Sequence, residues 1–213
     1  MFSIFYHVSI LKHWQKSDAI IQQYLNDSGI LKDCDNIFYC VNGDISKTNF
    51  TNGTVLHLSN DSTVAYEFPT LNFMHGYLHH NTTKALYIHT KGASSYDPKN
   101  ENRILYWLDT MCYYNIGKYK KALDLLETYD AVGSGHTPGY WPQAHFSGNF
   151  FWTKSEHVRK LKPLIIGNNF NSTDGWRVRH DAEKWIGSFK GNFCNLGNDY
   201  NESKYKQPPS KKV

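Results

Sequence analysis

The chain has 213 residues, 40% of them hydrophobic, and a formal net charge of +4, so it is long enough to bury a core without disulfides or metals. Much of the positive charge lies in residues 204–212, and no basic stripe runs through the body, which argues against a nucleic-acid partner. No apolar run approaches the ~18 residues of a membrane span, and the first residues do not resemble a signal peptide.

Four cysteines stand far apart without a C-x-x-C pair. This spacing is typical of reduced thiols rather than of a zinc knuckle or redox pair, and it favours a cytoplasmic location. Aromatic residues reach 15%. They suit a surface that stacks on sugar or base rings, but a core rich in Tyr and Phe explains the same figure, and composition alone favours the core.

Strand and helix patterns alternate along the chain. Strands are expected over residues 2–11, 36–41, 54–58 and 84–89. Between them, a helical repeat over 14–31 is expected to end near Ser28-Gly29, a C-cap signal, and a second helix is expected over 67–80. A long helix over 102–129, broken at Gly117, precedes strands over 130–134 and 146–152 and helices over 155–161 and 181–189. The rest, from residue 191 onward, is polar and is expected to be irregular.

This alternation predicts an α/β fold with a mostly parallel mixed sheet of about six strands, flanked by helices. Residues 1–190 would form one domain, and 191–213 a basic tail or linker that leads into further domains of a longer protein. In such sheets ligands bind beyond the carboxyl ends of the strands. Neither G-x-G-x-x-G nor G-x-x-x-x-G-K-S/T occurs, which argues against dinucleotide oxidoreductases and P-loop enzymes.

The first candidate site follows the strand predicted over 84–89. Lys91 would place a point charge on a pyrophosphate, and Thr90 would donate to a phosphate oxygen. His89 would bind a metal ion or a phosphate. The alternative is an ordinary strand end with a solvated lysine.

The second candidate interrupts an aromatic strand with the small polar residues Ser147, Gly148 and Asn149. A glycine in a strand often marks the close approach of a ligand, or a bulge. Ser and Asn side chains there would suit sugar hydroxyls, which need both donors and acceptors.

The third candidate lies at the start of the last predicted helix, where Asp181 and Glu183 stand two positions apart. Residues at this spacing face different ways on a helix, so they are not expected to share a proton. Asp181 suits the N-cap of the helix. Glu183 is the better candidate for a general base that points into a cleft.

Four motifs together, H-T-K-G at 89–92, W-x-x-x-M at 107–111, H-F-S-G-N-F-F-W at 145–152 and R-H-D-A-E-K-W-I at 179–186, resemble the glycosyltransferase domains of large DNA viruses of algae. The H-T-K element is also similar to one in rhamnan-synthesis proteins. The resemblance spans residues 2–189. It implies a GT-A fold, a UDP-sugar donor, Mn²⁺ as the cation and a glycan acceptor, that of the viral major capsid protein, in the host cytoplasm.

The resemblance also implies positions for the ligand. The nucleotide would lie over the first strands, near Tyr6, His7 and Asp44, and the F-S-G of 146–148 is similar to an F-N-S/A-G element that touches the donor sugar. GT-A enzymes usually carry D-x-D after the fourth strand to hold the metal, and here H-T-K occupies that place. His89 is then the first expected ligand of Mn²⁺.

In the mechanism that follows, Lys91, Arg103 and a cation stabilise the leaving diphosphate by electrostatics. Glu183 or Asp181 deprotonates the acceptor hydroxyl, and this general-base chemistry inverts the sugar. The donor sugar is glucose, galactose or rhamnose, with the H-T-K likeness favouring rhamnose. A non-catalytic carbohydrate-binding module is the alternative. A metal-dependent hydrolase, suggested by the 11 histidines, is a further alternative.

Overall fold

The computed structural model describes residues 1–60, 66–91, 101–138, 144–165 and 181–197. A seven-stranded sheet forms its centre, with strands in the order β3-β2-β1-β4-β8-β5-β9. These strands are β1 Phe2–Ser9, β2 Asn36–Asn42, β3 Thr54–Ser59, β4 Lys84–His89, β5 Ala131–Gly133, β8 Phe151–Lys154 and β9 Phe193–Asn195. A separate two-stranded ribbon joins β6 His136–Thr137 to β7 His145–Phe146.

The α/β architecture with a mostly parallel mixed sheet is as predicted, because four of the six neighbouring strand pairs are parallel. The sheet has seven strands rather than about six. The α-helices are α1 Trp14–Asp27, α2 Ile30–Asp33, α3 Phe68–His80, α4 Glu101–Cys112, α5 Tyr119–Leu125 and α6 Ser155–Val158. Shorter helical turns are the 3₁₀ turns η1 Ile45–Lys47 and η4 Trp185–Gly187 and the π-helical turn η2 Tyr113–Gly117.

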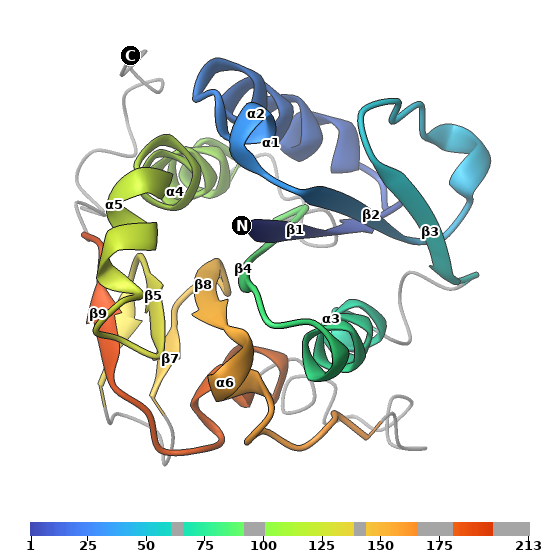
Figure 1. Ribbon diagram of the computed structural model, residues 1–213. Helices are drawn as coiled ribbons and strands as arrows, with labels where there is room; N and C mark the ends of the chain where they lie inside the picture. Colours follow the sequence, from blue (N-terminus) through green and yellow to red (C-terminus); the bar gives the residue numbers. More distant parts are fainter. Residues whose placement is uncertain (61–65, 92–100, 139–143, 166–180, 198–213) are drawn as a thin grey trace.

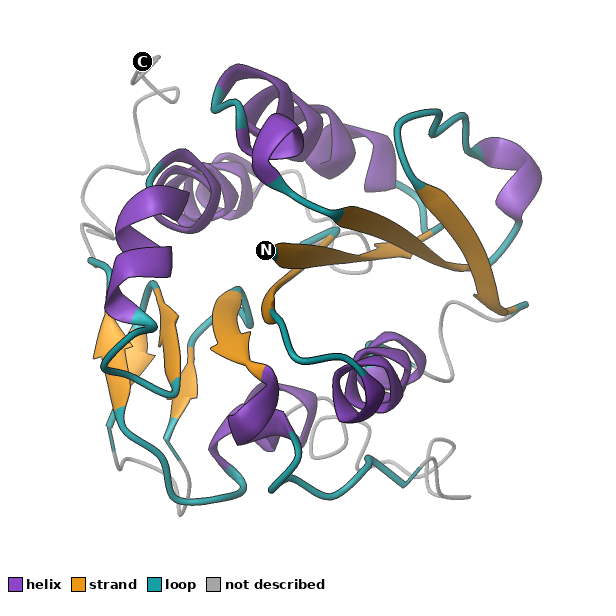
Figure 2. Cartoon of the chain, in the orientation of Figure 1, coloured by secondary structure: helices purple, strands orange, loops and turns teal. Residues whose placement is uncertain are grey.

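The sheet separates two layers of helices, as Figures 1 and 2 show. Helices α1, α4 and α5 cover one face, and α3 and α6 cover the other. Successive strand residues point to opposite faces, so Phe5 and Tyr6 of β1 enter different cores, as do Phe151 and Trp152 of β8. Since all four side chains are fully buried, these strands need apolar residues at consecutive positions.

Left-handed backbone marks two places where a regular element ends. The helical repeat over 14–31 ends at Ser28-Gly29 as its C-cap signal predicts, because Gly29 has φ +79°, and the short helix α2 follows. The continuous strand predicted over 146–152 is wrong: β7 and β8 are separated by a turn in which Gly148 has φ +90° and Asn149 has φ +58°. Neither conformation is compatible with a strand.

Two further predictions concern the second half of the chain. The long helix over 102–129 is interrupted as expected, because the π-helical turn η2 ends at Gly117 before α5 begins. The expectation of irregular structure from residue 191 is wrong for β9, which pairs in parallel with β5 and forms one edge of the sheet. Among the described residues, no helix combines the length and the apolar character that crossing a bilayer requires.

The strand order places a change of winding direction next to β1. From β1 the chain passes through α1 to β2 and on to β3 on one side, and after α3 it returns to β4 on the other side of β1. Because α1 and α3 cover opposite faces (Figure 1), the connections from β1 to β2 and from β3 to β4 run over opposite faces of the sheet, and the strand order reverses at β1. Ligands of open α/β sheets bind in the crevice that forms at such a place. We call the carboxyl ends of β1 and β4 the switch point.

Candidate functional site

The backbones of β1 and β4 are joined directly at the switch point. His7 pairs in register with His89, and the Thr90 backbone N–H donates to the His7 carbonyl at 3.0 Å. The Thr90 hydroxyl in turn accepts from the Ser9 N–H at 2.9 Å. Thr90 is only 4% exposed, so in this structure its hydroxyl bridges two strands rather than facing solvent.

The antiparallel strand β8 brings a third segment to the same place. It pairs Phe151 with Tyr87, so the residues just before β8 lie at the carboxyl end of β4. These residues, Ser147, Gly148 and Asn149, are called the 147–149 turn below. His89 Nε2 lies 2.8 Å from the Gly148 carbonyl oxygen, and since a carbonyl can only accept, Nε2 carries the hydrogen and donates it.

Gly148 packs closely against α4. A Cβ at this position would lie 2.4 Å from Sδ of Met111 and 3.2 Å from Cζ2 of Trp107. Ser147 lies on the other side of the turn, where its hydroxyl is 3.1 Å from that of Thr137 on β6. The turn is therefore fixed by packing as well as by hydrogen bonds, which is the kind of support that a ligand-binding element requires.

Glu67, the residue before α3, reaches the switch point from the opposite layer of helices. Its Oε2 accepts from the hydroxyl of Tyr87 at 2.9 Å and from Nδ2 of Asn149 at 2.5 Å. Its Oε1 lies 3.9 Å from Nδ1 of His89. The Glu67 side chain is 13% exposed, so this carboxylate is largely buried but well supplied with donors, as a buried charge must be.

His7 is held in the neutral form beside this carboxylate. Its Nδ1 lies 2.8 Å from the hydroxyl of Thr70 on α3, and the ring is 3% exposed. Burial lowers the pKa of His7 to about 4, against a smaller raising effect of Glu67. His7 is therefore uncharged at neutral pH and cannot supply a cation to a phosphate.

Lys91 is buried, so the alternative of a solvated lysine at the strand end is wrong. The residue is 5% exposed, its Nζ lies 3.9 Å from Oε1 of Glu183 and 4.3 Å from the centre of the Trp107 ring. Such a position over a tryptophan face attracts a cation. Lys91 and Glu183, 92 residues apart in the chain, are thus brought together at the switch point.

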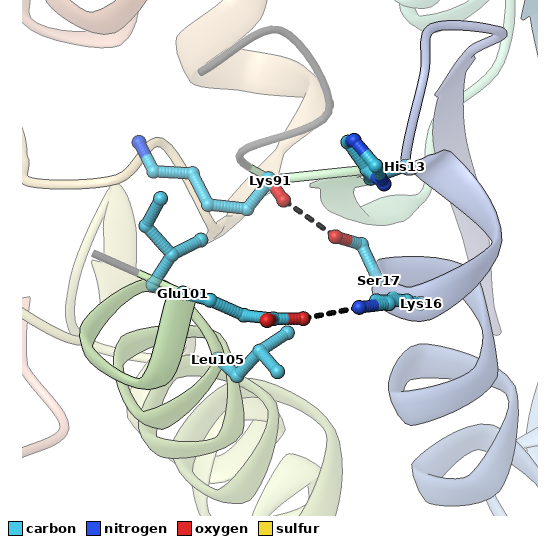
Figure 3. A pocket seen from close by; sticks show the side chains of 7 residues that line it. His13, Lys16, Ser17, Lys91, Glu101 and Leu105 are labelled. Atoms are coloured by element: carbon cyan, nitrogen blue, oxygen red, sulfur yellow. Dashed lines mark hydrogen bonds and ion pairs between the residues drawn. The ribbon is translucent and has the colours of Figure 1, made fainter. Parts of the chain in front are cut away.

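A small pocket opens beside Lys91, between α1 and α4 (Figure 3). The Ser17 hydroxyl donates to the Lys91 carbonyl at 2.6 Å, and Lys16 pairs with Glu101 across the opening. Figure 3 shows the Lys91 ammonium group extending away from Ser17 and Lys16. The backbone of Lys91 therefore lines the pocket, whereas its ammonium group lies outside the pocket, near Trp107 and Glu183. The lining residues are His13, Lys16, Ser17, Lys91, Glu101, Ile104 and Leu105.

Other predicted site residues lie apart from this group. Tyr6 is fully buried, and its hydroxyl donates to Asp18 at 2.8 Å, so it is a core residue and not a nucleotide contact in this structure. Asp44 is exposed after β2, where it caps η1 by accepting from the Ser46 N–H at 3.1 Å. Arg103 is exposed on α4.

The two carboxylates of the last helical turn separate as expected. Asp181 is exposed, whereas the Glu183 side chain is 17% exposed and faces Lys91. Asp181 is already helical, as are residues 182–184, so the prediction that it is the N-cap is wrong. Gly92, the segment 177–180 and the tail 204–212 lie outside the described residues.

The described residues do not fit the expected Mn²⁺ site. Within them, no group of three or more His, Cys, Asp or Glu side chains is placed to hold a metal ion. One ring nitrogen of His89, the expected ligand, is occupied by the Gly148 carbonyl, and Glu67 is the carboxylate beside the other. We therefore derive no step of the chemistry through a metal.

Sequence reasoning missed Glu67, Thr70 and Trp107. The sequence patterns place Glu67 only at the start of a helix and Trp107 only within a motif. A signal for Glu67 was available, since this glutamate next to a proline-containing first helical turn lies on the connection between β3 and β4, two strands that follow each other in the chain. Its side-chain partners were not, because Tyr87 and Asn149 are 20 and 82 residues away.

Fold and site together define an α/β protein with a doubly wound sheet and a buried lysine–glutamate pair at its switch point. No family model and no curated protein matches the chain. Among solved structures, the chain is similar to the bifunctional IspDF from Campylobacter jejuni, with a TM-score of 0.45 and 9% identity over 93% of this chain and 50% of that one. The chain thus spans about half the length of that structure, and a likeness this low assigns neither a family nor an activity.

Proposed function

We propose that the protein is a glycosyltransferase of the GT-A type that transfers a hexose or 6-deoxyhexose from a UDP-sugar to a glycan acceptor. The observation that carries the proposal is the pair formed by Lys91 and Glu183 at the switch point, 3.9 Å apart and largely buried. The resemblance to algal-virus glycosyltransferases supports the same assignment, and with it a capsid-protein glycan as the acceptor.

In the proposed reaction the acceptor hydroxyl oxygen forms a bond to the anomeric carbon, and the bond from that carbon to the diphosphate oxygen breaks. UDP leaves with the electron pair, and the hydroxyl proton passes to the Glu183 carboxylate. Lys91 stabilises the charge that develops on the diphosphate, and it does so from a site with little water, where such interactions are strongest. In an inverting displacement the base and the cation act on opposite sides of the anomeric carbon, so the contact between Lys91 and Glu183, 3.9 Å in this structure, has to open when donor and acceptor bind.

The Trp107 ring and the 147–149 turn complete the proposed donor site. Trp107 holds the Lys91 ammonium group over its face, which fixes the cation before the donor arrives. The hydroxyl of Ser147 lies at the surface of the turn, half-buried, and suits a hydroxyl of the donor sugar.

Thermal stability with ligands tests the donor first. UDP, GDP and CMP, each with and without Mn²⁺, are compared for their effect on Tm, followed by UDP-glucose, UDP-galactose and UDP-rhamnose. A nucleotide at 100 times its Kd stabilises by about 2.7 kcal/mol, so selective stabilisation by UDP is readily measured. A Tm that is indifferent to every nucleotide but raised by oligosaccharides would favour a carbohydrate-binding module instead.

Two substitutions then separate the roles in the pair. Glu183→Gln is expected to lower kcat by about 10²–10⁴-fold while UDP affinity stays near that of the wild type, and Lys91→Ala is expected chiefly to weaken UDP binding. The matched control is Asp124→Asn, which neutralises an exposed carboxylate on α5 and should leave both quantities unchanged. Loss of UDP binding in Glu183→Gln would move that residue to the donor site and remove the base.

A further inference from the structure

Left-handed backbone at residues with a Cβ is unfavourable, and it persists only where the surroundings enforce it. Among the described residues other than glycine, two have positive φ: Tyr66 at +43° and Asn149 at +58°. They stand 83 positions apart in the chain, yet one contact links Asn149 to the residue that follows Tyr66. Glu67, next to Tyr66, accepts a hydrogen bond from the side chain of Asn149.

The backbone of Tyr66, just before α3, is held by a hydrogen bond from β2. Asn42, at the end of β2 and completely buried, donates from Nδ2 to the carbonyl of Tyr66 at 2.8 Å. Glu67 then stands at the N-cap position of α3, but its side chain makes no capping bond to that helix. The carboxylate instead points across the switch point, where the positive end of the 13-residue helix favours its charge.

The Asn149 side is equally constrained. The Asn149 N–H donates to the Phe146 carbonyl at 2.9 Å, and His89 holds the carbonyl of the preceding Gly148. Oδ1 of Asn149 is buried without a hydrogen-bond partner among the described residues. A buried carbonyl oxygen without a hydrogen bond destabilises the fold. The hydrogen bond from Nδ2 to Glu67 offsets part of this cost and holds the side chain in place.

We propose that Glu67 is the positioning residue of the site: through Asn149 it fixes the left-handed conformation of the 147–149 turn, and so the place at which that turn meets the donor sugar. This inference rests on the proposed function for its substrate. Neither the sequence motifs nor the pair of Lys91 and Glu183 assigns a role to Glu67. Glu67 touches no reacting atom in this scheme, and its effect is transmitted through the turn.

Three variants test the proposal. Glu67→Ala removes the acceptor of the Asn149 bond, Glu67→Gln retains an oxygen that can accept it, and Tyr87→Phe removes the other hydrogen bond to the same Oε2 but leaves Asn149 in place. Asn149→Gly is added because glycine adopts positive φ without strain, so this variant loses the side-chain bond while the backbone conformation stays accessible.

The readouts are the backbone amide NMR signals of the turn and steady-state kinetics with the UDP-sugar that binds best. Glu67→Ala and Asn149→Gly are expected to broaden or shift the amides of Ser147 and Gly148 and to raise the KM for donor by about 10–100-fold, because small misplacements of a binding element have effects of this size. Glu67→Gln and Tyr87→Phe should stay within about threefold, whatever their loss of stability.

Each outcome decides one of the two proposals. Unchanged turn amides in both Glu67→Ala and Asn149→Gly would overturn the positioning role, even with an intact enzyme. If the turn amides change in these two variants but the wild-type protein binds no UDP-sugar, the structural link stands and the proposed function is overturned. If Glu67→Ala does not fold, Asn149→Gly carries the same test. A donor KM altered equally by Tyr87→Phe and by Glu67→Ala would reduce the effect to general destabilisation and refute the inference.

Discussion

Replacement of Gly148 by alanine tests the packing of the 147–149 turn on α4. With φ at +90°, Gly148 adopts a backbone conformation that costs a residue with a Cβ about 1–2 kcal/mol. The new methyl group would also lie 2.4 Å from Sδ of Met111, and Met111 is 1% exposed, so it has little room to move. Overpacking of this kind costs about 1–3 kcal/mol.

Gly148→Ala is therefore expected to lower the free energy of unfolding by about 2–5 kcal/mol, and Tm by about 10 °C for a chain of this size. Urea denaturation followed by circular dichroism measures the first quantity. Gly76→Ala is the matched control, because this glycine lies exposed within α3 with nothing within 4 Å of an added Cβ. There the same change should stabilise by up to about 1 kcal/mol. A Gly148→Ala protein within about 0.5 kcal/mol of the wild type would refute the packing described for the turn.

Three further predictions concern groups outside the turn. Because burial lowers the pKa of His7 from 6.5 to about 4, the unfolded chain binds this proton more readily than the folded one. Stability should therefore fall by up to about 3 kcal/mol as the pH drops from 6.5 to 4, and a pH series of urea curves should show His7→Gln lacking that part of the slope. Glu127→Gln, which breaks an exposed pair with Lys84, should cost less than about 1 kcal/mol in the same assay, and a larger loss would contradict the surface assignment. Burial raises the pKa of Cys40 to about 12 and that of Cys112 well above its usual value, so an Ellman titration should detect these two thiols only after unfolding, and rapid reaction in the native protein would show the core to be open.

Much of the fold follows from local sequence patterns. The consecutive apolar residues of β1 and β4 predict strands buried on both faces, and Pro69 in the first turn of α3 predicts the start of that helix. The course of the chain through the 147–149 turn was not predictable in the same way. Its aromatic neighbours have the pattern of one continuous strand. The conformation of the turn depends on the contact of Gly148 with His89, 59 residues away, and on that of Asn149 with Glu67, 82 residues away.

The candidate site was predictable in its ingredients but not in its connections. The rule that ligands bind at the carboxyl ends of parallel strands identified His89 and Lys91, and the spacing of the last helix separated Glu183 from Asp181. That Lys91 would be buried against Trp107 could not be read from a motif, because it depends on how α4 crosses the sheet. Tyr6 was misplaced because the sequence gives no precise end to β1, and one residue more or less turns a side chain from the crevice into the core.

The long separations within the site have a consequence for synthesis of the protein. A nascent chain that has reached residue 91 contains β1 to β4 and α3, yet its Glu67 and His89 still lack their partners in the 147–149 turn. Only when β8 emerges and pairs with β4 do these polar groups lose their contact with water and acquire fixed neighbours. Under the proposed function, the donor site is complete only after β8 and then Glu183 have been synthesised, when most of the polypeptide has left the ribosome.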